Sequence, residues 1–273
     1  MSRATIRGAE LAYDVAGSGP GPDVVLIHSA LADRRMWAGQ LAVLTPRHRV
    51  LSLDLRGFGE STLPAGEFSM NADVAELMAA VGMTRAVVIG SSMGGGVAID
   101  FALDHPDLLA GLVLVGAGLR GTKPSDLLQR VDAEVDALVE RGAIDEAVER
   151  ELQLWLDGPG RPAGTVAGAI REYVRETDLA VTRRAAAWSQ AKGIRPTPPV
   201  NERLEQIVAP TLVVVGEHDV PDMVTQAVEL ARRIPNAERI VIPGAAHLPS
   251  LERPDEFNAH LIRFLGRLAG SAG

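Results

Sequence analysis

Short runs of apolar residues, almost uninterrupted by polar side chains, recur along the chain and alternate with longer amphipathic segments. Examples are VVLI at 24–27, AVVI at 86–89 and TLVVV at 211–215. A strand that is apolar on both faces must be covered on both faces, as a parallel strand is between layers of helices. We therefore predict an α/β fold with a mostly parallel eight-stranded sheet, in which the first two strands form an antiparallel hairpin at the edge. The predicted strands are Ala4–Arg7, Leu11–Val15, Val24–His28, Val50–Leu53, Val87–Ile89, Leu112–Val115, Leu212–Val215 and Arg239–Ile242.

One interval between predicted strands, from Val115 to Thr211, is far longer than a crossover requires. A crossover needs roughly 10–12 residues including its helix. We predict that residues 121–200 form a helical cap, or lid, over the carboxyl ends of the strands, where open α/β sheets bind ligands. Residues 1–120 and 201–273 then form the core, and a helical appendage away from the site is the alternative. The predicted helices are Met36–Leu44, Ala72–Val81, Met93–Leu103, Val224–Arg233 and Asp255–Leu268 in the core, and Asp126–Arg141, Asp145–Leu156 and Ala169–Gln190 in the lid.

The composition argues against several classes of function. The formal net charge is −8 without a basic stripe, which argues against nucleic acid and anionic membranes as partners. The chain has no cysteine, and no clustered set of other ligands indicates a metal, so we expect no metal and no cofactor. The first residues lack the apolar stretch of a signal peptide, and no apolar run approaches the ~18 residues of a membrane span. We therefore expect a cytoplasmic protein that acts on a small molecule.

One serine lies in the setting of a catalytic nucleophile. The sequence GSSMG at 90–94 fits the pattern G-x-S-x-G, follows an apolar strand and opens a predicted helix. In a nucleophile elbow the serine occupies a strained strand-to-helix turn, and small residues on both sides let the backbone approach closely. The N–H of Met93, at the helix N-terminus, would face a developing oxyanion. We predict Ser92 as the nucleophile, and a glycine-rich turn without chemistry is the alternative.

A serine needs a base, and the base needs an acid to orient it. Among the six histidines, His247 follows the last predicted strand, from where it can reach the elbow, and His218 is its rival. The acid should follow the preceding strand, in the order serine, acid, histidine. That segment, TLVVVGEHDVPD, supplies Glu217, Asp219 and Asp222.

These segments together resemble the α/β-hydrolase superfamily, and within it the lid-bearing group of enol-lactonases, esterases, perhydrolases and C–C bond hydrolases. The resemblance covers nearly the whole core and only loosely the lid. It implies the α/β-hydrolase fold, a G-x-x-D turn that places the acid at Asp219, and a second oxyanion N–H in the loop after the third strand. That loop reads His28-Ser29-Ala30 in place of the usual His-Gly-x, and we assign the donor to Ala30. The segments that carry the resemblance are VVLIHSALADRRMW, LDLRGFGEST, VIGSSMGGGVAIDFALDHPD, TLVVVGEHDVPD and IPGAAHLPSLERPDEFN.

The resemblance further implies a serine hydrolase that cleaves an ester or lactone of a small molecule through an acyl-enzyme, with Ser92, Asp219 and His247 as its catalytic triad. C–C bond hydrolysis, perhydrolysis and acyl transfer on the same triad are alternatives, and a ligand-binding receptor on a hydrolase fold is the non-enzyme alternative. The candidate substrate-binding residues are Ser29, Trp155 and Trp188, of which the two tryptophans could equally belong to the core of the lid.

Overall fold

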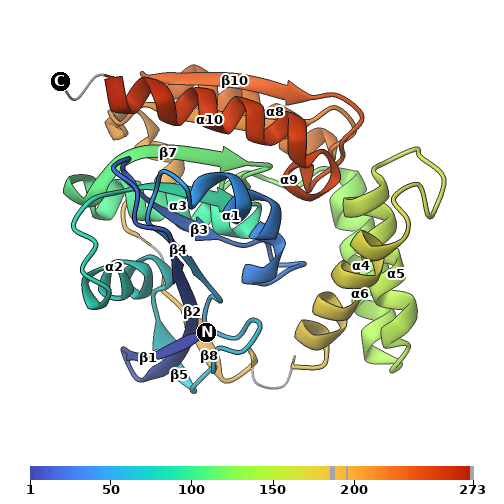
Figure 1. Cartoon of the computed structure of the whole chain (residues 1–273). Coiled ribbons are helices and arrows are strands. Elements are labelled where there is room, and N and C mark those ends of the chain that lie inside the picture. The colour runs from blue at the N-terminus through green and yellow to red at the C-terminus, as the bar shows by residue number, and fades with distance from the viewer. Residues whose placement is uncertain (185–187, 195, 271–273) are drawn as a thin grey trace.

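An eight-stranded sheet runs through the centre of the computed structural model, which describes residues 1–184, 188–194 and 196–270 (Figure 1). The strand order is β1-β2-β4-β3-β6-β7-β9-β10. Strand β2 pairs antiparallel with β1 and β4, and the other neighbours pair parallel. The predicted sheet and its antiparallel edge are confirmed. The strands are β1 (Ser2–Ile6), β2 (Ala9–Ala16), β3 (Asp23–Ile27), β4 (Val50–Leu53), β6 (Ala86–Ser91), β7 (Leu109–Val115), β9 (Thr211–Gly216) and β10 (Ala237–Ile242).

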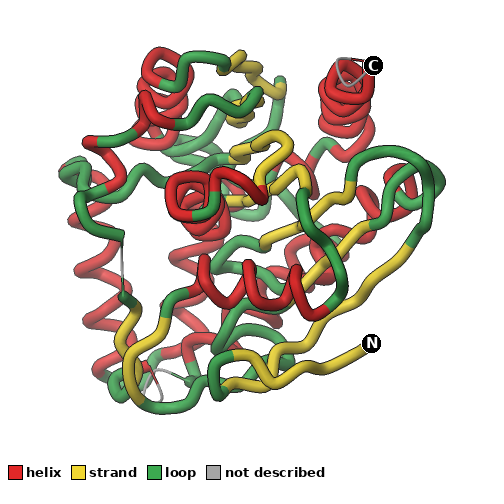
Figure 2. Tube along the Cα trace, turned by 90° about the vertical axis from the view of Figure 1, so that its left-hand side faces the viewer, coloured by secondary structure: helices red, strands yellow, loops and turns green. Residues whose placement is uncertain are grey.

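Helices cover both faces of this sheet (Figure 2). In β3, Val25 and Ile27 belong to the same apolar cluster as residues of α2, α3 and α8, whereas Val24 and Leu26 share a cluster with residues of α1 and α10. Successive residues of a strand point to opposite faces of the sheet. All four side chains are fully buried because helices cover both of these faces. The helices of the core are η1 (Arg34–Trp37), α1 (Ala38–Leu44), α2 (Met70–Ala80), α3 (Met93–Asp104), η2 (Pro106–Leu108), η4 (Val200–Glu202), η5 (Leu204–Gln206), α8 (Pro221–Arg233), α9 (Pro249–Glu252) and α10 (Pro254–Gly270).

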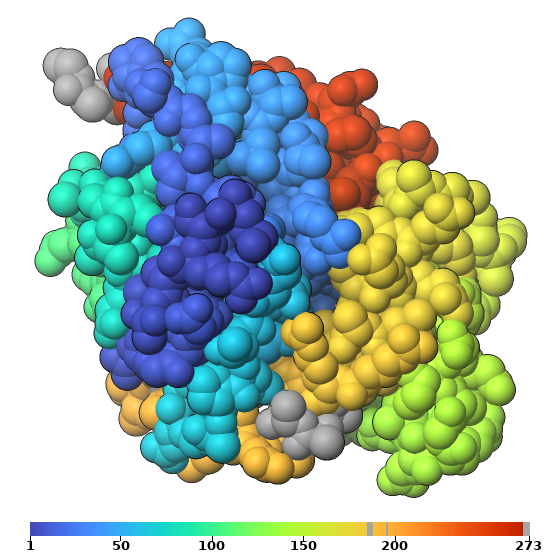
Figure 3. Space-filling view, turned by 60° about the horizontal axis from the view of Figure 1, so that its bottom comes forward, coloured from blue at the N-terminus to red at the C-terminus, as the bar shows by residue number. Residues whose placement is uncertain are grey.

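Four of the described helical segments between β7 and β9 lie together beside the core (Figure 1). In the space-filling view, their yellow residues lie next to the blue and cyan residues of the N-terminal part of the core (Figure 3). Val148, Leu152 and Val174 bury their side chains in the cluster that also holds core residues of α1 and α10. These insertion helices, as we call them below, are α4 (Asp126–Glu140), α5 (Ile144–Leu152), the π-helix η3 (Gln153–Asp157) and α6 (Ala169–Thr182).

The last insertion helix, α6, is shorter than the sequence predicts. A helix over Ala169–Gln190 is wrong in its length, because α6 ends at Thr182 and the next two residues form a turn. Just beyond this end, the guanidinium of Arg184 donates to the carbonyl oxygens of Gly57 and Gly59 at 3.1 Å, so a tertiary contact with the core begins where the helix stops. No glycine or proline marks this end in the sequence, and residues 185–187 of the predicted helix lie outside the described part of the chain.

Two further local features have no sequence pattern of their own. Strands β5 (Gly66–Phe68) and β8 (Ala191–Gly193) form a separate parallel pair, and three residues are too few to show an alternation. The predicted helix Asp145–Leu156 is one helical run whose last turn widens into the π-helix η3.

None of the helices that the structure describes is long and apolar enough to cross a membrane.

Candidate active site

Ser92 occupies a strained turn between β6 and α3. Its φ is 53° and its ψ is −114°, and its N–H donates to the carbonyl oxygen of Val115 at 2.8 Å. A Cβ on Gly90 would lie 2.2 Å from the carbonyl oxygen of Gly94, and a Cβ on Gly94 would lie 2.4 Å from that of His28. Both glycines are therefore required by close approach of the backbone, as in a strand–serine–helix elbow.

The structure brings Ser92, His247 and Asp219 together from three separate loops. The Ser92 hydroxyl lies 2.8 Å from Nε2 of His247, and Nδ1 of His247 lies 2.9 Å from Oδ1 of Asp219. That carboxylate oxygen also accepts the N–H of Val220 at 2.7 Å, which fixes the carboxylate in place. A carboxylate beside Nδ1 keeps the imidazole proton there and leaves Nε2 to accept the serine proton. The arrangement can therefore deprotonate Ser92 while its oxygen attacks an electrophile.

The alternative bases and acids lie elsewhere. The side chain of His218 is 41% exposed, and its Nε2 faces the carboxylate of Glu217 at 3.7 Å. Glu217 also accepts the N–H of Gly244 at 2.8 Å, and Asp222 accepts the N–H of Ser125 at 2.8 Å. Glu217 and Asp222 thus bind backbone amides of other segments, and none of the three side chains shares a hydrogen bond with Ser92 or His247 among the described residues.

The loop after β3 leaves one amide free beside the elbow. The N–H of Ser29 points at the sulfur of Met36 at 3.4 Å, the N–H of Leu31 donates to the Ser29 hydroxyl at 3.3 Å, and the N–H of Ala32 donates to the Ser29 carbonyl at 3.1 Å. Among the hydrogen bonds of the described residues, the N–H of Ala30 has no acceptor. The N–H of a first helical residue has no intrahelical acceptor either, and Met93 is the first residue of α3.

His28 braces this loop rather than touching Ser92. Its Nδ1 lies 2.7 Å from the carbonyl oxygen of Ser29, and its Nε2 lies 2.9 Å from the N–H of Leu55. The tautomer that satisfies both contacts is neutral, with its proton on Nδ1. Complete burial lowers the pKa of His28, which keeps the ring neutral. The histidine therefore ties β3 to the segment after β4 and sets the path of the loop.

Trp155 connects the insertion helices to His247. Its ring centroid lies 4.5 Å from the imidazole centroid, and its carbonyl oxygen accepts the backbone N–H of His247 at 3.2 Å. This residue belongs to the π-helix η3, a geometry that is frequent at functional sites. Of the two predicted tryptophans, Trp155 is thus the one that contacts a residue of the serine–histidine–aspartate array.

Trp188 lies in a different place. Its ring packs 5.3 Å from that of Phe58 and 6.4 Å from that of Phe68, and it touches Gly57, where a Cβ would lie 2.6 Å away. It also lines a cavity of about 350 Å³ together with Met93. The structure therefore places Trp188 in an aromatic cluster at one wall of a neighbouring cavity.

A cavity of about 270 Å³ opens directly over Ser92. Its walls come from the first turn of α3, the loop that follows β7, the start of α8 and insertion helix α4, which contributes Leu128. Met223 packs with Leu128 in one apolar cluster, so the far wall is apolar. The insertion and the core thus share the walls of the space in which a substrate would meet Ser92.

Insertion helix α6 is joined to the loop that carries Ala30. The hydroxyl of Thr177 donates to the carbonyl oxygen of Leu31 at 2.6 Å. The hydroxyl of Tyr173 accepts the N–H of Asp33 at 3.2 Å. Residue types on a helix do not reveal contacts with backbone atoms of a distant loop, so the sequence analysis missed both.

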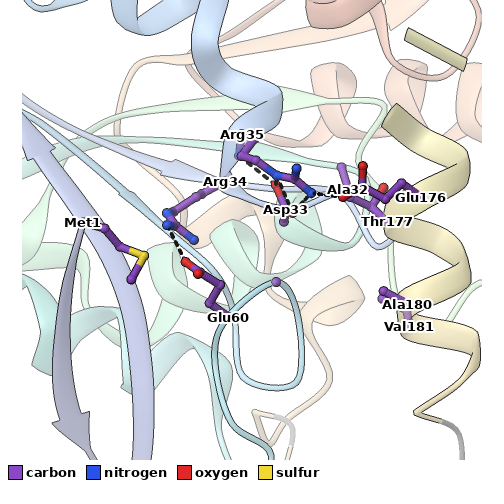
Figure 4. A pocket seen from close by; sticks show the side chains of 11 residues that line it. Met1, Ala32, Asp33, Arg34, Arg35, Glu60, Glu176, Thr177, Ala180 and Val181 are labelled. Carbon is purple, nitrogen blue, oxygen red and sulfur yellow. Dashed lines mark hydrogen bonds and ion pairs between the residues drawn. The ribbon is translucent and has the colours of Figure 1, made fainter. Parts of the chain in front are cut away.

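A cleft of about 480 Å³ lies beside this junction, and Figure 4 shows its charged residues. The guanidinium of Arg35 lies 2.8 Å from the carboxylate of Asp33 and 3.0 Å from that of Glu176 on α6. The guanidinium of Arg34 pairs with Glu60 at 2.8 Å. Of these ion pairs, the one between Arg35 and Glu176 joins η1 to α6, so the cleft marks a junction between the core and the insertion.

A mainly parallel eight-stranded sheet with a serine on a strained strand-to-helix turn defines the class of α/β hydrolases. The chain belongs to the alpha/beta hydrolase fold family, whose profile matches residues 22–254. It is 28% identical to the pimeloyl-(acyl-carrier protein) methyl ester esterase of Nitrosospira multiformis, over 92% of this chain and 97% of that protein. Predicted membership of the superfamily and hydrolase class is confirmed.

Two solved structures share nearly the whole chain. A thermophilic esterase from Thermogutta terrifontis is 31% identical with a TM-score of 0.80, over 98% of this chain and 99% of the other. The enol-lactonase from Burkholderia xenovorans is 26% identical with a TM-score of 0.79, over 97% of this chain and 100% of the other. The similarity therefore extends through the insertion helices as well as the core.

Proposed function

We propose that this protein hydrolyses carboxylic esters or lactones of small molecules through an acyl-enzyme formed on Ser92. The observation that carries the proposal is the unbroken hydrogen-bond path from the Ser92 hydroxyl through His247 to Asp219. Similarity to proteins named as an esterase and an enol-lactonase supports carboxylic esters as the bond type.

In the proposed mechanism, the oxygen of Ser92 attacks the carbonyl carbon while its proton moves to Nε2 of His247. Asp219 accepts the hydrogen bond from Nδ1 and stabilises the imidazolium that results. His247 then returns the proton to the leaving alcohol, which departs and leaves the acyl group on Ser92. A water molecule, deprotonated by the same imidazole, attacks the acyl-enzyme; the imidazolium then gives that proton to the departing oxygen of Ser92, which restores the hydroxyl and releases the acid.

The amides of Met93 and Ala30 are the proposed oxyanion donors. Both are backbone N–H groups beside the elbow, and neither has an intramolecular acceptor that would compete. Fixed donors aimed at the developing negative charge lower the barrier more than they strengthen substrate binding. The buried Ser29 supports this loop through its own hydroxyl and carbonyl groups, and we propose this supporting role for it in place of direct substrate contact.

We propose that residues 121–200 act as a cap over the site, with residues 1–120 and 201–273 as the core. Leu128 of α4 lines the cavity over Ser92, and Trp155 of η3 packs on His247. A substrate bound at Ser92 would therefore lie between the sheet and the insertion helices, so insertion residues would influence which acyl groups fit.

The test is covalent labelling with a fluorophosphonate probe, combined with a panel of acyl esters and lactones. Ser92→Ala should lose labelling and lower turnover by several orders of magnitude. Ser91→Ala is the matched control, because that hydroxyl is buried in β6 and should leave labelling intact. Labelling that persists in Ser92→Ala, or a protein that hydrolyses no ester or lactone of the panel, would overturn the proposal.

A further inference from the structure

His247 lies on a short buried loop between β10 and α9. Residues 245–248 are at most 1% exposed and belong to no helix or strand. A buried N–H that no regular structure binds needs another acceptor, because water cannot reach it. The partners of these amides therefore decide where the backbone of His247 lies.

One carboxylate, that of Glu252, accepts the N–H groups on both sides of His247. The N–H of Ala246 donates to its Oε2 at 2.8 Å, and the N–H of Leu248 donates to its Oε1 at 2.9 Å. Among the hydrogen bonds of the described residues, neither amide has another acceptor. The N–H between them, that of His247, donates to the carbonyl oxygen of Trp155. The carboxylate of Glu252 therefore fixes the backbone immediately before and immediately after the histidine.

The surrounding backbone leaves this loop little room to shift. Glu252 ends the one-turn helix α9, and its own N–H donates to the carbonyl oxygen of Leu248 at 2.9 Å, so its side chain folds back over the turn. At the end of β9, a Cβ on Gly216 would collide with the carbonyl oxygen of Ala246. The loop thus packs against the backbone of β9 and is bound by the carboxylate of Glu252.

The charge of Glu252 also acts on His247. Burial raises the pKa of the Glu252 carboxyl group, whereas its two amide hydrogen bonds and the positive charges of His247 and Arg161 lower it. Because an electrostatic interaction is mutual, a carboxylate that the imidazolium stabilises also stabilises the imidazolium. The histidine becomes positive when it takes the serine proton, so the carboxylate favours that step.

We propose that Glu252 is a positioning residue, whose carboxylate holds the loop of His247 so that Nε2 stays within reach of the Ser92 hydroxyl. The inference rests on the function proposed above. Nε2 lies 2.8 Å from that hydroxyl, and a displacement of ~1 Å can cost about 10²-fold in rate. Asp219 binds Nδ1 and orients the ring, but it does not hold the backbone from which the ring projects. Glu252 supplies that second constraint.

The experiment measures the rate constant for labelling of Ser92 by a fluorophosphonate probe, together with kcat and KM on the ester panel. Glu252→Ala removes both acceptors. Glu252→Gln keeps the size of the side chain but offers one acceptor oxygen, and its NH₂ group would face the other N–H. In both variants the labelling rate and kcat should fall by about 10- to 100-fold, with a smaller change in KM. The factor should be the same for short and long acyl chains, because the base acts on every ester.

A matched control and a melting curve separate positioning from a purely structural role. Glu217→Gln weakens another carboxylate contact with a backbone amide just before the same loop, that of Gly244, and should keep the wild-type labelling rate. A purely structural role for Glu252 would lower the melting temperature and leave the labelling rate of the folded protein unchanged. A wild-type labelling rate in folded Glu252→Gln would therefore overturn the proposal, and this variant decides alone if Glu252→Ala does not fold.

Labelling also keeps this inference separate from the proposed function, because it requires the activated serine but no ester. A wild-type protein that is labelled at Ser92 but hydrolyses no ester or lactone, with labelling slowed at least about tenfold in Glu252→Gln, would refute the esterase proposal and retain the positioning role. Ester hydrolysis and labelling at wild-type rates in folded Glu252→Gln would overturn the positioning role and leave the esterase proposal standing. A wild-type protein that is not labelled would overturn both.

Discussion

A buried and a partly buried carboxyl group, Asp178 and Glu151, meet between insertion helices α6 and α5, and they make the stability of the protein depend on pH. Asp178 is 4% exposed, and burial together with the carboxylate of Glu151 raises its pKa from 3.8 to about 9. Burial also raises the pKa of Glu151, and the charges of Asp132 and Asp136 on α4 act in the same direction. The pair therefore holds at pH 7 a proton that the unfolded chain has released.

The size of the effect follows from the two pKa values. At pH values between the pKa of Asp178 in the unfolded chain and its pKa in the folded protein, only the folded protein binds the proton. The free energy of unfolding therefore falls as pH rises. The slope is about 1.4 kcal/mol per pH unit. From pH 3.8 to pH 7 the loss amounts to about 4 kcal/mol. Asp178→Asn removes this titration. The difference in free energy of unfolding between the variant and the wild type should therefore change by about 3 kcal/mol in favour of the variant from pH 6 to pH 8.

Urea unfolding at pH 6, 7 and 8, followed by circular dichroism, measures this difference. The difference between Asp178→Asn and the wild type should grow steadily with pH, and Glu151→Gln/Asp178→Asn should show the same trend. Glu140→Gln replaces an exposed carboxylate on α4 and serves as the control with a flat profile. A constant difference between Asp178→Asn and the wild type would refute the idea that Asp178 holds the proton.

Three substitutions in the candidate active site give further expectations. Asp219→Asn should lower kcat by up to about 10⁴-fold while Glu217→Gln retains activity, and the reverse order in steady-state kinetics would show that the wrong acid was chosen. Ala30→Pro removes one proposed oxyanion N–H and should lower kcat by about 10²–10³-fold with a smaller change in KM. Ala30→Ser keeps the amide and is the control, and full turnover in a correctly folded proline variant would exclude this donor. Trp155→Ala should lower kcat by up to about tenfold through loss of the ring contact with His247, and it should alter how activity depends on acyl-chain length. If Trp155→Ala and Trp188→Ala both kept the wild-type dependence on chain length, both rings would have a purely structural role.

The core was predictable because its physical constraints are visible in residue types. A run such as VVLI has both faces buried, and that requirement alone indicates a central parallel strand. The end of α6 at Thr182 was not predictable, because no breaker residue marks it and tertiary contacts decide where the helix stops. The strand pair β5–β8 was not predicted for a related reason, because a strand of three residues is too short to show an alternation of apolar and polar side chains.

The candidate site divides in the same way. Ser92, Asp219 and His247 could be selected because chemistry demands particular side chains at the carboxyl ends of particular strands. The contact from the carbonyl oxygen of Trp155 to the N–H of His247 could not, because any residue type offers the same backbone atoms.

The hydrogen bonds from α6 to the loop before η1, and from η3 to His247, have a consequence for inactivation by heat. Elements held to a domain by few contacts open locally at a lower free energy than the whole domain unfolds. If the insertion helices detach first, Trp155 leaves the imidazole and Thr177 leaves the loop that carries Ala30, although the sheet is still intact. A heated sample should then lose its activity several degrees below the temperature at which its secondary structure disappears. Thermostabilising such a protein would therefore begin at the contacts between the insertion helices and the core. Additional packing within the sheet would only extend the lifetime of an already inactive molecule.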